Sequence, residues 1–186
     1  MASIRLVRHA ESVWNRAGLV QGQADAPGLT DVGRAEARRL AVHLRRVEAG
    51  VVLTSDLLRA IETAEIVAEG LSAPLVIDRR LRERALGAAE GRPASTISPR
   101  SLGVHDGAVV DADCQPAGGE SIRDLYQRVA ALLDDLSGRP SADRLVVVTH
   151  GGVIRVAMAY AAALSVTNMP WPSLANAAVR GVDLPD

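Results

Sequence analysis

The sequence predicts an α/β fold: a three-layer sandwich with a mostly parallel central sheet and helices on both faces. Short apolar runs typical of buried strands alternate along the chain with longer segments whose apolar residues recur every three or four positions. Such alternation favours a parallel sheet covered by helices. The 186 residues fit one domain, 1–186, and a composition of 48% apolar and 23% charged residues is that of an ordinary globular protein.

Five apolar runs bounded by polar or turn residues are the expected strands. They are residues 4–7, 51–54, 75–77, 145–148 and 177–184. The run at 145–148 is continuous and rich in β-branched residues, which is typical of a fully buried central strand. The last run is expected at an edge of the sheet.

Periodic apolar stripes predict the helices. They cover residues 30–48, 57–68, 121–136 and about 153–164. The first stripe includes Val32 and Leu40. Ser55 or Asp56 is placed to cap the second helix, and Ser121, with Asp124 three residues later, resembles a capping box for the third. Between 87 and 119 the pattern gives way to Gly, Pro, Ser and Asp, which predicts a long loop or excursion, usually functional or mobile.

The charged residues restrict the chemistry. Basic and acidic residues nearly balance, 21 against 22, so nothing global indicates nucleic acid or a membrane surface as a partner. All the basic residues are Arg, which excludes a lysine Schiff base and a Walker-type phosphate loop. Guanidinium groups remain, and they bind phosphate or carboxylate through paired hydrogen bonds. Cys114 is the one cysteine, which excludes an intramolecular disulfide and a cysteine-based zinc site.

No targeting or membrane segment is expected. Arg5, Arg8 and His9 interrupt the N-terminus before a signal-type apolar run develops. The longest apolar region, 145–164, contains His150 and Arg155 and is better interpreted as a buried strand, a turn and a buried helix than as a membrane span. A cytoplasmic location is therefore expected.

Chemically competent side chains directly follow three of the expected strands. They are Arg8 and His9, then Ser55, Asp56 and Arg59, then His150, Gly151 and Gly152. Ligands of such sheets bind beyond the carboxyl ends of the strands, so two histidines and two arginines converge if these strands are neighbours. That combination suits phosphoryl chemistry: the arginines bind equatorial oxygens, one imidazole attacks phosphorus, and the other donates to the developing charge.

Each residue also has an ordinary structural interpretation. A histidine after a strand more often caps or packs, and Arg59 alone would be a solvated residue in the first turn of a helix. The Gly151–Gly152 pair could form only a turn, although it also offers free N–H groups at a helix N-terminus. Together, at three strand ends, these residues favour a phosphate pocket.

The sequence around these residues resembles the histidine phosphatase superfamily, which includes the cofactor-dependent phosphoglycerate mutases. The matching blocks, in family order, are Leu6–Ser12 with Asn15, Gln21–Gly22, Leu29–Gly33, Thr54–Ala64, Leu81–Glu83 with Gly87 and Glu90–Gly91, Gly118–Ser121, and Val148–Arg155. They span nearly the whole chain, and the first and last are highly specific. The resemblance implies a phosphoglycerate mutase-like fold.

The resemblance also implies roles. The catalytic residues would be His9, Glu83, Arg8, Arg59 and His150. Further substrate contacts would come from Asn15, Gln21, Gly22 and the Gly151 backbone. A neutral His9 would attack to give a phosphohistidine, and Glu83 would protonate the leaving alkoxide and later activate water. The alternative for Glu83 is a surface ion pair, because it is surrounded by Arg79, Arg80, Arg82 and Arg84. No metal and no organic cofactor is expected, and the partner would be a small-molecule phosphate ester.

Two departures from the family bear on the reaction. Ala89 stands where an aromatic residue is frequent, and residues 91–118 contain no aromatic residue. Contacts from the excursion are therefore expected from residues such as Arg92, Arg100, His105, Ile97 and Leu102. The family's mutases tend to have larger insertions here and a C-terminal tail, and a short cap admits water, which favours hydrolysis.

The expected function is hydrolysis of a small phosphorylated metabolite, a phosphomonoester, through a phosphohistidine. The first alternative is a cofactor-dependent phosphoglycerate mutase. The second is a non-catalytic module that binds phosphate or phosphoprotein.

Overall fold

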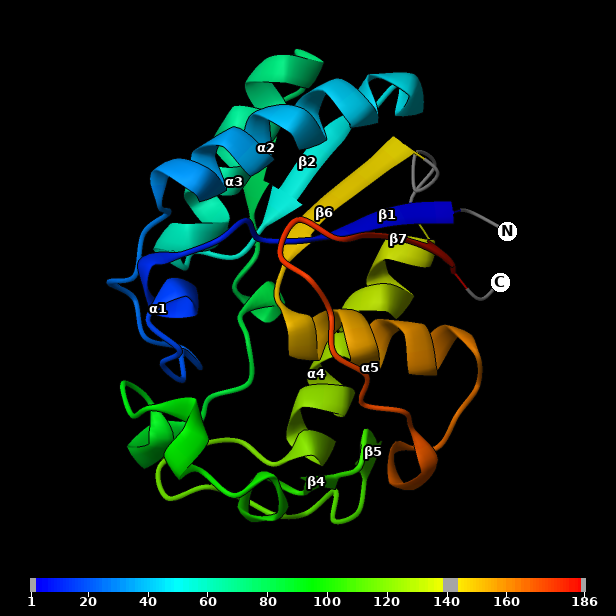
Figure 1. Ribbon diagram of the computed structural model, residues 1–186. Helices are drawn as coiled ribbons and strands as arrows, with labels where there is room; N and C mark the ends of the chain where they lie inside the picture. The colour runs from blue at the N-terminus through cyan, green and yellow to red at the C-terminus, as the bar shows by residue number, and fades with distance from the viewer. Residues whose placement is uncertain (1–2, 139–143, 185–186) are drawn as a thin grey trace.

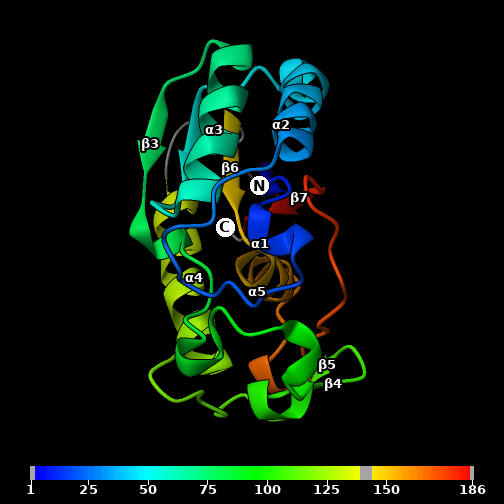
Figure 2. The same cartoon turned by 60° about the vertical axis from the view of Figure 1, so that its left-hand side comes forward.

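The computed structural model describes residues 3–138 and 144–184. Its central sheet has five strands in the order β3-β2-β6-β1-β7 (Figure 1; β3 is labelled in Figure 2). The strands are β1 (Ser3–Arg8), β2 (Val51–Thr54), β3 (Leu75–Ile77), β6 (Leu145–Thr149) and β7 (Val179–Asp183). Neighbouring strands are parallel except β7, which pairs antiparallel with β1 at the edge. The predicted α/β fold with a mostly parallel sheet is confirmed.

The register of the three inner strands brings their carboxyl ends to one level. β6 lies between β2 and β1, and all five of its residues are buried, as predicted for a strand covered on both faces. Arg8 aligns with Thr149, and Thr54 aligns with Val148. The residues that follow these strands therefore meet at one edge of the sheet.

Helices cover both faces of this sheet. α2 (Asp31–Leu44) and α3 (Leu58–Leu71) lie on one face, and α4 (Ile122–Ser137) and α5 (Gly151–Ala161) lie on the other (Figures 1 and 2). Successive strand residues alternate between the two cores: Leu6 packs in the α4–α5 core and Val7 in the α2–α3 core.

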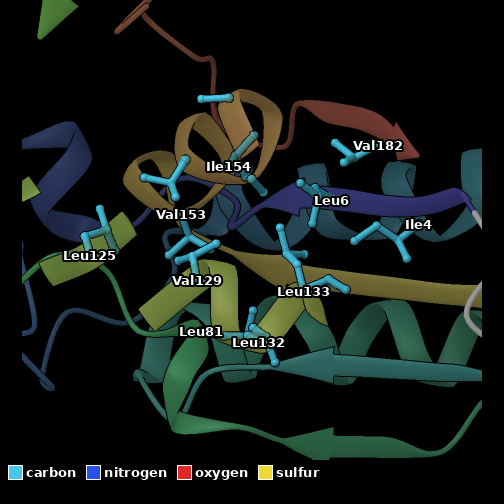
Figure 3. Packing of buried hydrophobic residues seen from close by; sticks show 14 of the residues in the cluster. Ile4, Leu6, Leu81, Leu125, Val129, Leu132, Leu133, Val153, Ile154 and Val182 are labelled. Carbon is cyan, nitrogen blue, oxygen red and sulfur yellow. The ribbon is translucent and has the colours of Figure 1, made fainter. Parts of the chain in front are cut away.

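The apolar stripe predicted for residues 121–136 packs in the core between the sheet and helices α4 and α5. Leu125, Val129 and Leu132 of α4 are fully buried and pack in one cluster with Ile4 and Leu6 of β1 (Figure 3). Truncating one such leucine to alanine typically costs about 2–5 kcal/mol. The capping box is also confirmed: Ser121 accepts from the Asp124 amide, and the Asp124 carboxylate accepts from the Ser121 amide.

Four local predictions are wrong. The α-helix expected over 30–48 ends at Leu44 and is followed by a 3-10 turn over Arg45–Val47. Val32 is 53% exposed, whereas Leu40 is buried as predicted; the buried face consists of Gly33, Ala37, Leu40, Ala41 and Leu44. Gly33 packs so closely that a Cβ there would lie 2.1 Å from the Glu11 carbonyl oxygen. No side chain caps α3, whose N-cap is Leu57. α5 begins at Gly151 rather than near 153, so both glycines lie in its first turn.

The predicted excursion at 87–119 is confirmed as a long segment without α-helix. It contains three short 3-10 turns and a hairpin of two-residue strands, β4 (Val104–His105) and β5 (Ala108–Val109). The buried Arg84 anchors it, because its guanidinium donates to the carbonyls of Leu102 and Cys114 at 2.6 and 2.8 Å. No helix within 3–138 or 144–184 has the length and apolar character needed to cross a membrane.

Candidate active site

A cavity of about 420 Å³ lies at the carboxyl end of the sheet, between the strand ends and the excursion. Seven of the residues predicted for the site line it: Arg8, His9, Asn15, Gln21, Gly22, Arg59 and Glu83. His150 and Gly151 are buried next to this cavity rather than in its lining, and the neighbouring Gly152 lines it instead. The structure thus brings together residues from three strand ends, as predicted.

His9 is held in one tautomer. Its Nδ1 lies 2.8 Å from the carbonyl oxygen of Ala10, and a carbonyl can only accept, so Nδ1 carries the proton. Nε2 therefore presents its lone pair, and it has no partner among the described residues. Burial, reinforced by the charges of Arg59 and Arg8, holds the pKa of His9 well below its ordinary value. His9 is a neutral imidazole with a free nitrogen, as a nucleophile requires.

His150 lies beside His9 with 5.2 Å between the ring centroids. Its Nε2 is 2.7 Å from the Ser55 hydroxyl oxygen, while its Nδ1 is buried without a partner in the described part of the chain. Burial, with Arg59 nearby, lowers the pKa of His150 well below its ordinary value. When Ser55 donates to Nε2, the proton of the neutral ring is on Nδ1, which can then donate to an anion. Ser55 thus orients His150 rather than capping α3.

Arg59 and Arg8 supply positive charge and form no ion pair with a carboxylate among the described residues. Arg59 is fully buried in the first turn of α3, where Nη1 and Nη2 donate to the carbonyls of Ala24 at 3.0 Å and Gly22 at 2.7 Å. Burial lowers the pKa of Arg59 to about 10, so it stays charged at neutral pH. Arg8 donates to the Leu174 carbonyl.

The Nε atoms of Arg8 and Arg59 are both buried without a partner among the described residues, which also show no ion pair from either guanidinium to a carboxylate. Buried charges of this kind are costly unless an anion binds them. The solvated alternative for Arg59 is wrong.

The segment after β1 adds amide groups. Asn15 Oδ1 accepts from the Ser12 amide at 3.1 Å and from Asn176 Nδ2 at 3.0 Å, which leaves its own Nδ2 without a partner in the described chain. Gln21 Oε1 is 2.8 Å from the Ser12 hydroxyl. Gly22 has φ of 50°, and a Cβ there would lie 2.1 Å from a carboxylate oxygen of Glu90, so only glycine fits.

The Glu83 carboxylate is held at the N-terminus of α5. The Gly152 amide lies 3.0 and 3.1 Å from its two oxygens, and the Arg84 amide donates to one of them at 2.8 Å. Arg128 fixes the preceding backbone by donating to the carbonyls of residues 80 and 82. Because the Gly152 amide binds Glu83, the prediction that both glycine amides are free for a ligand is wrong for Gly152.

The surface ion-pair alternative for Glu83 is wrong. Arg79 and Arg82 pair with Asp56, and Arg80 pairs with Asp78 and Asp135. Arg84 is buried on backbone carbonyls. None of these four arginines forms an ion pair with Glu83 in the described part of the chain.

Some lining residues could not be identified from the sequence. Within the excursion, Leu102 lines the cavity as expected, together with Ala94 and Val104. The other residues expected there do not line it: Arg92, Arg100, His105 and Ile97. Arg92 and Arg100 are exposed, and His105 faces Asp106 at 3.2 Å. An aromatic residue reaches the cavity from the segment between α5 and β7, as Trp171, together with Arg155 of α5.

Within residues 3–138 and 144–184, no group of three or more His, Cys, Asp or Glu side chains is placed to hold a metal ion. Arginines among the described residues supply positive charge to the cavity. A cavity with two neutral imidazoles, two buried guanidinium groups and one carboxyl group can bind a phosphoryl group and offer it a nucleophile, and the carboxyl group can donate a proton when it is protonated.

Comparisons with known proteins agree with this geometry. The family model described as histidine phosphatase superfamily, branch 1, matches residues 4–186. Phosphoglycerate mutase-like protein 4 of Arabidopsis thaliana is 42% identical over 159 residues, covering 83% of this chain and 68% of that protein. The probable phosphoglycerate mutase GpmB of Yersinia enterocolitica is 35% identical over 159 residues, covering 81% and 70%.

Among solved structures, the mycobacterial glucosyl-3-phosphoglycerate phosphatase with VO3 is 30% identical and superposes with a TM-score of 0.86. It covers 97% of this chain, which covers 92% of it. The shared fold thus accompanies the sequence match. The chain belongs to branch 1 of the histidine phosphatase superfamily.

Proposed function

We propose that this protein hydrolyses phosphomonoesters through a phosphohistidine formed on His9. The observation that carries the proposal is the state of His9. Its Nδ1–H donates to the Ala10 carbonyl oxygen, and its Nε2 is unprotonated in a cavity that Arg8 and Arg59 line. Such an imidazole attacks phosphorus without first losing a proton.

In the first step, the N–P bond to His9 Nε2 forms while the ester P–O bond breaks. The partnerless Nε atoms of Arg8 and Arg59 and the Nδ1 of His150 are the buried groups available to the phosphoryl oxygens. Glu83, whose carboxyl group accepts from the Gly152 amide, enters this step as the carboxylic acid, gives its proton to the leaving alkoxide and becomes the carboxylate that acts in the second step. General acid assistance of this kind contributes about 10²–10⁴-fold.

In the second step, the Glu83 carboxylate takes a proton from water, whose oxygen attacks phosphorus. The N–P bond breaks, inorganic phosphate leaves, and His9 returns to its neutral form. Arg8 and Arg59 stay in place through both steps, because neutral carbonyls rather than carboxylates hold them. Their charge is therefore aimed at the phosphoryl group throughout the reaction.

Two observations favour water as the final acceptor. The similar solved structure is named as a phosphatase, and the excursion over the cavity contains short 3-10 turns and a hairpin of two-residue strands, without an α-helix to cover the site. The second candidate is a mutase, in which His9 returns the phosphoryl group to the substrate. The names of the two similar curated proteins favour that candidate.

A product assay on 3-phosphoglycerate and a panel of other phosphomonoesters separates the two activities. Inorganic phosphate and 2-phosphoglycerate are measured together, with and without added bisphosphoglycerate, and the His9→Ala variant gives the background. We expect phosphate release that needs no bisphosphoglycerate. Formation of 2-phosphoglycerate that depends on bisphosphoglycerate and exceeds phosphate release would establish the mutase, and neither product from any ester would leave only a phosphate-binding role.

A further inference from the structure

Arg155 lines the cavity, but the proposed reaction does not use its guanidinium group. It lies one turn after Gly151 and Gly152 on α5 and lines the same cavity as His9 and Glu83. Its Nη1 would be 2.8 Å from a Cβ on Gly151, so it sits directly against the first turn of the helix. That turn holds the Glu83 carboxylate through the Gly152 amide. Arg155 is therefore on the side of the cavity where the alcohol leaves.

The guanidinium of Arg155 is fixed in direction. Its Nε donates to the Pro172 carbonyl at 2.6 Å, and its plane lies over the Trp171 ring with the guanidinium carbon 5.0 Å from the ring centre. The Trp171 amide in turn donates to Gly107 in the β4–β5 turn at 2.6 Å. Nη1 and Nη2 have no hydrogen-bond partner within the described chain. This is a preorganised pair of N–H donors without an acceptor.

The charges of the cavity favour an additional anion. Its charged lining consists of the arginines Arg8, Arg59, Arg84 and Arg155 against the single carboxylate of Glu83. A phosphate dianion offsets two of these positive charges, and both histidines are neutral. Arg84 already binds three backbone carbonyls, whereas Arg155 binds one. Burial lowers the pKa of Arg155, and the Glu83 carboxylate acts in the opposite direction, so negative charge near Arg155 stabilises its charged form.

We propose that Arg155, held by Trp171 and Pro172, binds a second anionic group on the alcohol portion of the substrate. The preferred substrates would then be phosphomonoesters whose alcohol carries a carboxylate or a second phosphate a few bonds from the ester oxygen. This inference rests on the proposed hydrolase function. Arg155 is a specificity-determining residue, which contacts the leaving group and not the transferred phosphoryl group.

A matched series of esters tests the proposal. The series has three esters that share a three-carbon chain and differ only at its far end: propyl phosphate, 3-phosphonooxypropanoate and propane-1,3-diol bisphosphate. Their five-carbon homologues test a longer distance between the ester phosphate and the second anionic group. For wild type, Arg155→Gln and Arg155→Lys, kcat/KM is measured on each ester. Arg100→Gln, an exposed arginine outside the cavity lining, is the matched control.

We expect Arg155→Gln to lower kcat/KM about 10–100-fold for the anionic ester that Arg155 binds, which is the effect of losing a charge-assisted hydrogen bond. Propyl phosphate should change less than about 2-fold, and Arg155→Lys should recover part of the loss, because it keeps the charge but loses the planar pair of donors. The ester that shows the selective loss identifies the anion as carboxylate or phosphate. Equal losses on all esters, or no wild-type preference for an anionic ester, would overturn the proposal.

Binding to a catalytically blocked protein separates this inference from the proposed hydrolysis. In the His9→Ala background, calorimetry measures the Kd of each ester without turnover. Arg155→Gln should weaken the anionic ester about 10–100-fold there and leave propyl phosphate unchanged. If wild type releases no phosphate from any ester but this selective loss remains, the hydrolase proposal fails and the binding role stands. If the loss is not selective, the binding role fails.

Discussion

Replacing Gly152 with alanine would displace the Glu83 carboxylate while leaving the Glu83 side chain itself unchanged. A Cβ on Gly152 would lie 2.2 Å from Glu83 Oε1, well inside the 3.4 Å at which ordinary contact begins. The carboxylate must therefore withdraw by about 1 Å, which stretches its contact with the Gly152 amide beyond hydrogen-bonding distance. A catalytic group misplaced by about 1 Å can cost about 10²-fold in rate.

The fold should tolerate this change. Gly152 lies in the first turn of α5, where alanine is intrinsically better than glycine by up to about 1 kcal/mol. The other close neighbour of the new Cβ is Leu125 Cδ2 at 3.2 Å, the end of a flexible side chain that needs to move by only a few tenths of an ångström. Gly138→Ala is the matched control, because nothing lies within 4 Å of a Cβ at that position.

The assay compares an alkyl ester with an aryl ester. We expect kcat/KM for propyl phosphate to fall about 10²-fold, while p-nitrophenyl phosphate changes little, because nitrophenolate leaves without a proton. Because Glu83 also activates water, the aryl ester should show a fast burst of nitrophenolate followed by slower turnover. A double-mutant cycle isolates the contact: in a Glu83→Ala background, Gly152→Ala should cost almost nothing further.

Three results would refute the reasoning. Gly152→Ala could leave propyl phosphate hydrolysis at the wild-type rate, or it could slow both esters to the same extent without a burst. It could also cost as much in the Glu83→Ala background as in the wild type. Any of these would separate Gly152 from Glu83, and the first, if Glu83→Gln behaved in the same way, would remove Glu83 from the proposed mechanism.

Two further predictions follow from the charges of the site. Chelators should leave hydrolysis unchanged, since arginines supply the positive charge; loss of activity that zinc or magnesium restores would contradict this. Because burial lowers the pKa of both His9 and His150, the unfolded chain takes up protons below about pH 6.5 and the folded chain does not. The free energy of unfolding should therefore be independent of these two histidines above that pH, and should fall below it by up to about 1.4 kcal/mol per histidine for each pH unit. Urea unfolding at about pH 7.5 and 5.5 measures this difference in the free energy of unfolding. The variant His43→Gln, at an exposed histidine, should show the same dependence on pH as the wild type. A free energy of unfolding that does not change between the two pH values would contradict the burial argument.

The elements that the sequence predicts well are those whose pattern is local. β6 is a continuous β-branched run, and α4 shows its capping residues and its apolar stripe within its own segment, so neither depends on distant partners. Hydrophobicity alone places Val32 on the wrong face of α2. The close approach of the Glu11 backbone selects Gly33 for that face instead, and this contact comes from another part of the chain.

The residues of the site also fall into those that the local sequence predicts and those that depend on distant parts of the chain. The positions of Arg8, His9, Arg59 and His150 could be predicted because each lies at or shortly after the end of a strand, and the carboxyl ends of parallel strands converge. The contact between Ser55 and His150 joins residues 95 positions apart, and Trp171 reaches the cavity from an irregular segment that carries no periodic signal. The local sequence predicts a free Gly152 amide, because nothing near Gly152 in the chain reveals that this amide donates to Glu83. Partners set by tertiary packing are what the sequence alone does not show.

The most direct test of the account is to trap the phosphorylated enzyme. Wild type, quenched during turnover of p-nitrophenyl phosphate, should carry up to about one phosphate per chain that is labile in acid and stable in base, and peptide mass spectrometry should place it on His9. The His9→Ala variant should remain folded, carry no such phosphate and lose turnover. Phosphate on any other residue, or normal turnover by His9→Ala, would contradict the assignment of His9 as the nucleophile.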